Sequence, residues 1–288
     1  MKQLKIEIMY RNIDKIISAP LVSMGAIKLR QPLPIAGTEQ ISPVILLHHF
    51  DINMQPGHND FDVPPHPHRG FMPITFMYEG AVEHDDSLGN TKVIGDNEVQ
   101  WINAARGIIH SEKTGKEFSE KGGRFHGIQL WINLPASEKM KTPSYQPITK
   151  DEIVLIEKEG VQFRLVSGKY DGKTGPAKSD VVTAMIHMKE GSDYSISLPE
   201  SNNVILYVLE GNLDINDENS VKQHDLISFK HSNEQIKLNA KSDCALLLVS
   251  GDPINEPMVT HGPFVMNTQT EIMEAMRDYK NGKMGFLY

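Results

Sequence analysis

Residues 74–80 read Ile-Thr-Phe-Met-Tyr-Glu-Gly, an apolar run of strand length that ends in a Glu-Gly turn. The same arrangement returns at residues 204–211, which read Val-Ile-Leu-Tyr-Val-Leu-Glu-Gly. Each run is followed by a polar strand, a turn and another apolar strand, at residues 99–102 and 226–229. Glu-Gly is a common turn, so chance is the competing explanation. A hairpin order that is used twice nevertheless favours two barrels produced by duplication.

Short apolar runs between turn signals recur along the whole chain, and 22 glycines and 17 prolines are scattered among them. Many short strands at this spacing are typical of a sandwich or a barrel, so the sequence predicts an all-β fold. The predicted strands are residues 44–50, 74–78, 99–103, 127–133, 152–156, 161–166, 181–188, 204–209, 226–229 and 245–250.

Helical periodicity is convincing only near the end of the chain. Residues 268–271 (Thr-Gln-Thr-Glu) have the spacing of a capping box. The apolar residues Ile272, Met273 and Met276 that follow would share one face of a helix, and Gly282 would end it. The sequence therefore predicts a short C-terminal helix.

The stretch at residues 136–147 is polar, bounded by prolines and poor in branched apolar residues, which is typical of a linker. We therefore expect an N-terminal barrel in residues 1–135. We expect a second barrel, ending in the helix, in residues 148–288. With 288 residues, 39% of them hydrophobic, the chain is long enough for two separate cores.

Charge and cysteine content exclude several classes of function. The formal net charge is −8, so the chain has no general attraction for nucleic acid, and none is expected as a partner. Its single cysteine, Cys244, cannot form an internal disulfide or a thiolate cluster, which fits a reducing compartment. No signal peptide or apolar membrane span is visible. We expect a soluble cytoplasmic protein.

Histidines are concentrated in one place, with three of the twelve in residues 58–68. Side chains at i and i+2 of a strand point to the same face, so His66 and His68 can aim two imidazoles at one point inside a barrel. His110 and Glu112 repeat this spacing, and two hairpin strands could bring the two pairs together. One His-x-His pair occurs by accident on surface strands. Two i, i+2 pairs of possible ligands, one His-x-His and one His-x-Glu, each beside a glycine turn, predict a mononuclear metal site.

This set of ligands limits the choice of metal. Three nitrogen donors and one oxygen donor, without a thiolate, suit Fe(II), Mn, Ni, Co, Cu(II) or Zn. On an octahedral ion, four protein ligands leave two positions open for O2 or for a chelating substrate. Zinc in a closed tetrahedral site would use the same four ligands in a structural role.

At this point the sequence resembles the pirin family of the cupin superfamily. The matching phrases are HPHRGF (66–71), EGAVEHDDSLGN (79–90), VQWINAARGIIHSE (99–112) and GGRFHGIQLWINLP (122–135). The resemblance implies a bicupin, with two stacked antiparallel β-barrels of the jelly-roll type. It also implies one site for iron, as Fe(II), in the N-terminal barrel, with His66, His68, His110 and Glu112 as its ligands.

Two positions bear on how far the resemblance extends. The family usually reads HPHRGFE, but this chain has Met72 in place of the glutamate, which removes a carboxylate that could tune the metal. The second barrel of the family binds no metal. Here the second half has no His-x-His pair, and His224 and His231 lie seven residues apart.

Several other side chains are more simply explained by structural roles than by ligation or catalysis. His126 lies on a strand and could reach the cavity, but a hydrogen-bonded barrel histidine is the simpler interpretation. Glu83, Asp85 and Asp86 are interpreted as a solvated turn. The same structural interpretation applies to His48, His49, His84, Trp101, Trp131, Arg69 and Arg106, the last two as members of ion pairs.

Two classes of function follow. The first is a quercetin 2,3-dioxygenase-like enzyme, since some pirins cleave flavonols with O2. Glu112 would then be both ligand and catalytic base, and Phe50, Phe71 and Phe125 could flank a small aromatic substrate. The second is a non-enzymatic iron-binding protein that regulates a transcription factor or a metabolic enzyme. We favour the enzyme, and a regulatory protein partner is the alternative.

Overall fold

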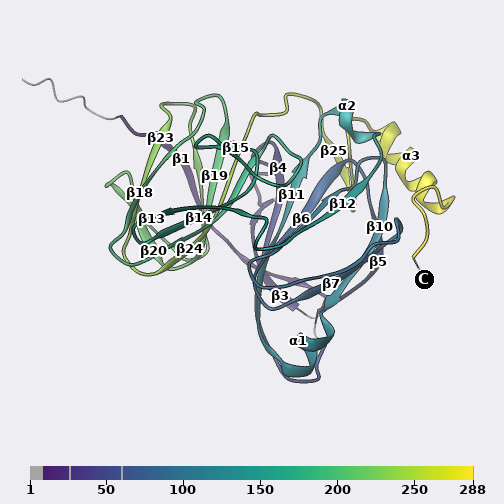
Figure 1. Cartoon of the computed structure of the whole chain (residues 1–288). Helices are drawn as coiled ribbons and strands as arrows, with labels where there is room; N and C mark the ends of the chain where they lie inside the picture. Colours follow the sequence, from purple (N-terminus) through teal and green to yellow (C-terminus); the bar gives the residue numbers. More distant parts are fainter. Residues whose placement is uncertain (1–8, 26, 60, 288) are drawn as a thin grey trace, which may run out of the picture. The chain divides into compact units, whose positions relative to one another are not determined.

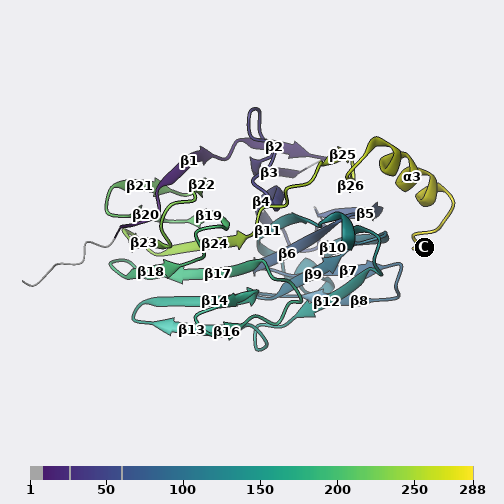
Figure 2. The same cartoon turned by 90° about the horizontal axis from the view of Figure 1, so that it is seen from above.

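The structure, a computed structural model, describes residues 9–25, 27–59 and 61–287. It divides into two compact units. The N-terminal unit contains the described parts of Ala19–Ile153 and Pro253–Tyr288, and the C-terminal unit contains the described parts of Met1–Ser18 and Val154–Asp252. Figures 1 and 2 show that β-strands dominate both units.

The N-terminal unit is built from two antiparallel sheets. Among its described residues, the large sheet has the strand order β12 (Ser144–Ile148), β9 (Val99–Asn103), β6 (Phe71–Glu79), β11 (Gly123–Asn133), β4 (Val44–Met54), β3 (Ile27–Leu33) and β2 (Leu21–Met24). The small sheet has the order β5 (Asp62–His68), β10 (Ile108–Thr114), β7 (Val82–Asp86) and β8 (Thr91–Ile94). Side chains from both sheets form one apolar core, with Phe50 and Phe125 from the large sheet and Val82 and Ile94 from the small one.

The C-terminal unit repeats this plan. Its large sheet has the order β1 (Ile13–Ser18), β22 (Asp225–Phe229), β19 (Asn203–Glu210), β24 (Cys244–Gly251), β17 (Val182–Met188), β14 (Val161–Ser167) and β13 (Val154–Lys158). Its small sheet has the order β18 (Asp193–Ser197), β23 (Gln235–Ala240), β20 (Asn212–Ile215) and β21 (Asn219–Lys222). Phe163, Leu206, Ile196 and Leu238 are members of the core between these sheets.

The two units match strand for strand. In the order of each large sheet, β6 and β19 are the third strands and β11 and β24 are the central ones, so β6 corresponds to β19 and β11 to β24. In each small sheet, β5 corresponds to β18 and β10 to β23. The predicted all-β fold with two barrels of the same order is therefore confirmed.

The remaining elements are short. They are the hairpin of β15 (Lys169–Tyr170) and β16 (Lys173–Thr174), the pair β25 (Val259–His261) and β26 (Phe264–Met266), and the helices α1 (Lys116–Lys121), α2 (Ala136–Lys139) and α3 (Gln269–Lys280). No helix among the described residues has the length and the apolar character of a membrane span.

All ten strands predicted from apolar runs are present, and all ten belong to the two large sheets. Most of these strands are buried on both faces, as in β6 and β24, and a strand without a solvent face has a continuous apolar sequence; the edge strand β13 is the exception and is largely exposed. The strands of the small sheets are less apolar. In β18, buried and exposed residues alternate, which is a weaker signal over five residues.

The predicted domain borders are wrong at both ends and in the middle. β12 lies within the predicted linker but pairs with β9 of the N-terminal unit. β1 precedes that unit in sequence but pairs with β22 of the C-terminal unit. Each large sheet is thus completed at one edge by a strand from a distant part of the chain, which satisfies backbone groups that would otherwise be unpaired.

The C-terminal helix is confirmed, but it belongs to the N-terminal unit, where α3 lies beside β25 and β26 (Figure 2). Thr268 and Glu271 form the expected capping box, with a 3.2 Å bond from the Glu271 amide to the Thr268 hydroxyl. Ile272 is buried as predicted, whereas Met273 is 61% exposed and was placed on the wrong face. Gly282 follows the helix with φ +70°, a conformation that favours glycine.

Candidate metal centre

Three of the four predicted ligands converge in the N-terminal unit. On the paired strands β5 and β10, His66 lies directly opposite His110, and His68 lies two residues further along β5. One ring nitrogen from each of the three histidines lies within 4.8 Å of the others. The two strands are neighbours in the sheet but are not a hairpin, because four strands separate them in sequence.

Burial keeps His68 and His110 neutral. His68 and His110 are 2% and 0% exposed, and burial lowers the pKa of both imidazoles well below the usual value. The neighbouring imidazoles, His66 foremost for His68 and His68 foremost for His110, lower both pKa values further. Neutral imidazole is the form that binds a metal.

Each ring has a nitrogen directed at the centre of the cluster. Nε2 of His66 lies 3.1 Å from Nε2 of His68, while Nδ1 of His66 lies 2.9 Å from the Pro64 carbonyl. A carbonyl only accepts, so Nδ1 of His66 carries the hydrogen and Nε2 has the lone pair. Nε2 of His110 is buried and has no hydrogen-bond partner among the described residues. Such an atom needs a partner, and a metal ion would supply one.

The fourth predicted ligand, Glu112, is held apart from the three histidines. It is 2% exposed on β10, and its Oε1 accepts hydrogen bonds from Gln100 Nε2 at 2.7 Å and from the Thr75 hydroxyl at 3.4 Å. Its Oε2 accepts a longer bond, 3.3 Å, from Gln129 Nε2. Three imidazoles and the carboxylate of Glu112, two residues from His110 on β10, form a donor set that fits a borderline divalent ion. Gln100, Thr75 and Gln129 were not found from the sequence, because they lie on three different strands.

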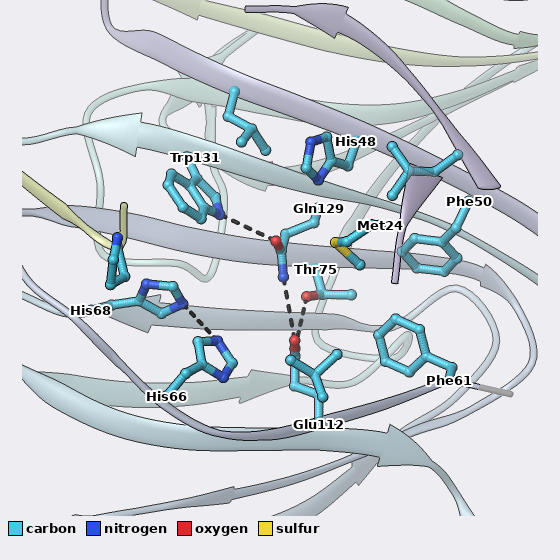
Figure 3. Close-up of a pocket in the computed structure, with 14 residues that line it drawn as sticks. Met24, His48, Phe50, Phe61, His66, His68, Thr75, Glu112, Gln129 and Trp131 are labelled. Atoms are coloured by element: carbon cyan, nitrogen blue, oxygen red, sulfur yellow. Dashed lines mark hydrogen bonds between the residues drawn. The ribbon is translucent and has the colours of Figure 1, made fainter. Parts of the chain in front are cut away.

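His66, His68 and Glu112 line one side of a cavity of about 290 Å³ in the N-terminal unit, while His110 lies behind the cavity wall. Figure 3 shows His66 and His68 together at one end, with Phe50 and Phe61 at the other. Most of the remaining lining is apolar, and it consists of Met24, Leu29, Leu46, Val63, Trp131 and Pro263, with His48, Thr75 and Gln129 as further polar members. An apolar cavity with a few convergent polar groups is the usual form of a small-molecule site.

The aromatic residues are divided between cavity wall and core. Phe50 lines the cavity as expected, together with Phe61, which the sequence analysis did not name. Phe125 packs behind these two rings in the core. The expectation that Trp131 is a core residue is wrong, since its ring faces the cavity at 5.3 Å from the ring of His68.

The interpretation of Glu83, Asp85 and Asp86 as a simple solvated turn is wrong for Asp86. On β7, His84 and Asp86 are 0% and 3% exposed, and His84 Nε2 lies 3.0 Å from Asp86 Oδ2. Burial opposes ionisation of Asp86, but hydrogen bonds from His84 and Asn90 outweigh it and lower the pKa of the carboxyl. The i, i+2 spacing of His84 and Asp86 on a strand is the signal that could have identified this pair.

A second cluster of possible ligands lies on β4 and β11 and consists of His49, Asp51 and His126. The predicted structural role of His126 is supported, since its Nε2 lies 2.9 Å from Nε2 of His49. Arg124 occupies both carboxylate oxygens of Asp51 at 2.8 Å and lowers the pKa of that group. A cation would have to compete with this guanidinium, so we do not assign a metal to this cluster.

Two further positions have clear surroundings. Arg69 forms the predicted ion pair, with Nη1 3.1 Å from Asp278 Oδ2, and is therefore engaged with α3 rather than directed at a substrate. Met72 is buried on β6, three residues from Thr75. Strand alternation places Met72 on the face opposite to Thr75, which lines the cavity. The missing family glutamate therefore leaves this cavity wall unchanged.

The C-terminal unit has no comparable cluster among its described residues. The strands that correspond to β5 and β10 are β18 and β23, and their inward residues Tyr194, Ile196, Ile236 and Leu238 belong to the apolar core. Apolar side chains thus fill the volume that imidazoles occupy in the other unit.

Fold and site together define a two-barrel cupin with one candidate metal centre. The comparisons with known proteins agree. The family described as "Pirin" matches residues 26–132, and the "Pirin C-terminal cupin domain" matches residues 183–285. The chain belongs to the pirin family.

Three relatives show how far the similarity extends. A pirin-like protein from Solanum lycopersicum is 35% identical over 267 residues, which cover 91% of this chain and 88% of that protein. The crystal structure of a quercetin 2,3-dioxygenase from Acinetobacter baumannii has a TM-score of 0.90 and 32% identity, and the match covers 97% of this chain and all of that one. A bacterial pirin from Escherichia coli, solved in complex with nickel(II), has a TM-score of 0.66 at 22% identity, covering 83% and 99% of the two chains, which shows the fold alone.

Proposed function

We propose that this chain is a metal-dependent dioxygenase that cleaves the ring of a flavonol of the quercetin type, or of a similar small enolisable aromatic molecule, with O2. The observation that carries the proposal is the cluster of three imidazoles, those of His68 and His110 fully buried, at one end of an apolar cavity that Glu112 also lines. The solved relative with 32% identity is named as a quercetin 2,3-dioxygenase, which supports this class of substrate.

We propose His66, His68, His110 and Glu112 as the ligands and Fe(II) as the metal, with Mn, Ni, Co, Cu and Zn as alternatives that the donor set also accepts. The bound ion would supply a Lewis acid and, for iron, redox chemistry toward O2. The nickel(II) complex of a pirin with the same fold supports a site for a divalent ion of this kind.

The protein's own groups bind the substrate and move its proton. The apolar wall, with Phe50 and Phe61, would hold an aromatic ring and exclude water. Glu112 is the carboxylate that lines the cavity, and we assign it as the base that accepts a hydroxyl proton when the enolate forms. Gln100 fixes the Oε1 atom of Glu112, so Oε2 is the oxygen with the weaker internal partner.

The size of the cavity supports a small substrate. Its volume of about 290 Å³ lies at the lower end of the range for ligand pockets, which begins near 300 Å³. A flavonol would therefore fill this cavity closely. It would serve as a test substrate in place of a smaller aromatic molecule with the same enolisable hydroxy-ketone.

The test uses protein purified without a histidine tag, stripped of metal and reloaded separately with each of the six metals. Aerobic consumption of quercetin is followed at the flavonol absorbance band, and metal content is measured on the same samples. For the wild type we expect about one equivalent of bound metal, and turnover when that metal is iron. In His66→Ala and His110→Ala we expect neither bound metal nor turnover.

Metal binding without turnover under any loading would overturn the enzymatic proposal and favour the iron-binding regulatory alternative. Full metal occupancy in both histidine variants would overturn the ligand assignment itself. A second equivalent of metal that survives His66→Ala would place a site elsewhere in the chain.

A further inference from the structure

The phrase EHDDSLGN at residues 83–90 has no role in the chemistry described so far, although it lies next to the site. It forms β7 and the turn that follows, and β7 pairs with the ligand strand β10. In this register Asp86 lies opposite His110, and His84 lies opposite Glu112. The buried side chains of His84 and Asp86 therefore lie next to the candidate ligand strand.

The carboxylate of Asp86 determines which nitrogen of His84 carries the hydrogen. Its Oδ1 accepts hydrogen bonds from the amides of Leu88 at 2.9 Å and Asn90 at 3.0 Å, and its Oδ2 accepts from the Asn90 side chain at 2.8 Å. The remaining contact of Oδ2 is His84 Nε2 at 3.0 Å. An ionised carboxylate only accepts, so the hydrogen of His84 lies on Nε2.

The assignment of donor and acceptor nitrogens at His84 determines the assignment at His110 as well. In a neutral imidazole with its hydrogen on Nε2, Nδ1 is an acceptor. Nδ1 of His84 lies 3.4 Å from Nδ1 of His110, so His110 donates from Nδ1 and keeps a lone pair on Nε2. This Nε2 is the buried atom without a partner. Tyr145 stacks on His84 at 4.2 Å with an interplanar angle of 7° and fixes the plane of the ring.

We propose that Asp86 and His84 are positioning residues that hold His110 in the tautomer whose Nε2 is ready to bind the metal. This inference rests on the metal site proposed above. Outer partners of ligating histidines orient the ring and strengthen its donor nitrogen, and their loss typically weakens metal binding 10–100-fold. The Asp86–His84–His110 series gives the phrase EHDDSLGN a function beyond its turn.

Asp86→Asn breaks the series without changing the shape of the side chain. If its amide oxygen stays with the Leu88 and Asn90 amides, its NH2 group faces His84 Nε2, where two donors cannot meet. His84 must then move its hydrogen to Nδ1, which drives the hydrogen of His110 onto Nε2 and blocks that atom as a ligand. Asp85→Asn is the matched control, because Asp85 is the next residue on β7 and contacts Thr91 instead.

The experiment reads tautomers by long-range ¹H–¹⁵N correlation on histidine-labelled protein, first without metal and then with Zn(II). We expect the wild type to have His84 with its hydrogen on Nε2, and His110 with its hydrogen on Nδ1, before any metal is added. In Asp86→Asn this pattern should be lost and the Kd for Zn(II) should rise 10–100-fold, while Asp85→Asn should match the wild type.

Finding the hydrogen of His84 on Nδ1, or of His110 on Nε2, in the metal-free wild type would overturn the inference without any variant. An unchanged Kd in folded Asp86→Asn would overturn it as well. Because the tautomers are read without metal, this failure is distinct from failure of the proposed metal site, which would appear as unchanged metal binding by His110→Ala.

Discussion

Gln100 donates a 2.7 Å hydrogen bond from its Nε2 to Oε1 of Glu112, and both side chains are buried. The two residues lie on different sheets, since Gln100 belongs to β9 and Glu112 to β10. The bond therefore anchors the carboxylate of the ligand strand to the opposite wall of the barrel. One carboxylate oxygen is thus fixed, while the other accepts only the longer 3.3 Å bond from Gln129.

Gln100→Leu should weaken metal binding 10–100-fold, because the carboxylate loses the partner that orients it. It should also lower the free energy of unfolding of the metal-free protein by about 1–3 kcal/mol, the usual cost of leaving a buried acceptor unsatisfied. Thr75→Val is the graded comparison, because the Thr75 hydroxyl lies 3.4 Å from the same oxygen and contributes less. Chelator competition and urea unfolding measure the two quantities. Equal effects of both substitutions would contradict the anchoring role of Gln100.

Metal-free protein should lose stability as the pH falls from about 6.5 to about 4. Burial lowers the pKa of His48 to about 4, whereas the unfolded chain has the ordinary value near 6.5. Within this window the unfolded state binds more protons, so the free energy of unfolding falls as the pH is lowered, by at most about 3 kcal/mol from this residue. His68 and His110 act in the same direction.

His48→Gln should remove the contribution of His48 and flatten the pH dependence of the free energy of unfolding, because glutamine does not titrate. Glutamine can still donate to Gln31 Oε1, which in the wild type accepts from His48 Nε2 at 2.8 Å. Both tryptophans, Trp101 and Trp131, lie in the N-terminal unit, so their fluorescence reports urea unfolding of the unit that contains His48. Parallel profiles for wild type and variant between pH 4 and 7 would show that His48 does not contribute.

The features that the sequence could predict came from local patterns. The convergence of His66, His68 and His110 could be predicted from their spacing, because side chains on one face of a strand repeat every two residues; the role of these residues and of Glu112 as metal ligands stays a prediction. Ten strands of the large sheets could be predicted from apolar runs, because most of them are buried on both faces, as β6 and β24 are. Each of these signals lies within a few residues of sequence.

The failures involved pairings across long distances in sequence. Nothing near Ser18 or Ser144 indicates that β1 joins β22 or that β12 joins β9, since an edge strand is chosen by the geometry of the finished sheet. The anchoring of Glu112 by Gln100 depends on the same long-range register. The prediction for Asp86 was wrong because a sequence does not distinguish a solvated acidic residue in a turn from a buried carboxylate. The difference lies in the hydrogen-bond donors that surround the carboxylate in the folded chain.

Arg11 gives a test of the corrected domain borders. Its guanidinium is fully buried in the C-terminal unit and donates to the carbonyls of Lys230, Pro199, Glu200 and Asn202. Hydrogen bonds to charged groups contribute about 1.5–3 kcal/mol each and are not additive, so Arg11→Ala should cost at least about 3 kcal/mol.

The loss in Arg11→Ala should fall on the C-terminal unit. Far-UV circular dichroism should show an earlier transition, while tryptophan fluorescence and metal content at low denaturant stay at the wild-type values. A variant that loses metal and fluorescence signal together with its dichroism would place Arg11 in the N-terminal unit, as the original borders required.

Glu112→Gln separates the roles of ligand and base. The amide keeps an oxygen for Gln100, so its NH2 group replaces Oε2, the atom that now accepts the 3.3 Å bond from Gln129. The three histidines should still hold a metal, although more weakly, because a neutral amide is a poorer donor to a divalent ion. The variant has no carboxylate at this position to take a substrate proton, and loss of a general base costs a factor of about 10² to 10⁴ in rate.

Activity of Glu112→Gln should therefore fall far more than metal occupancy when iron is supplied in excess. Flavonol consumption and metal content are measured on the same samples. Glu83→Gln on β7 is the matched control, since Glu83 pairs with Lys113 at 3.0 Å instead of lining the cavity, and it should keep the wild-type rate. If metal-replete Glu112→Gln turned over flavonol as fast as the wild type, Glu112 would be at most a ligand, and the proton would have to leave by another group. The candidates would then be the remaining polar side chains of the cavity, beginning with His48, whose imidazole is neutral at pH 7.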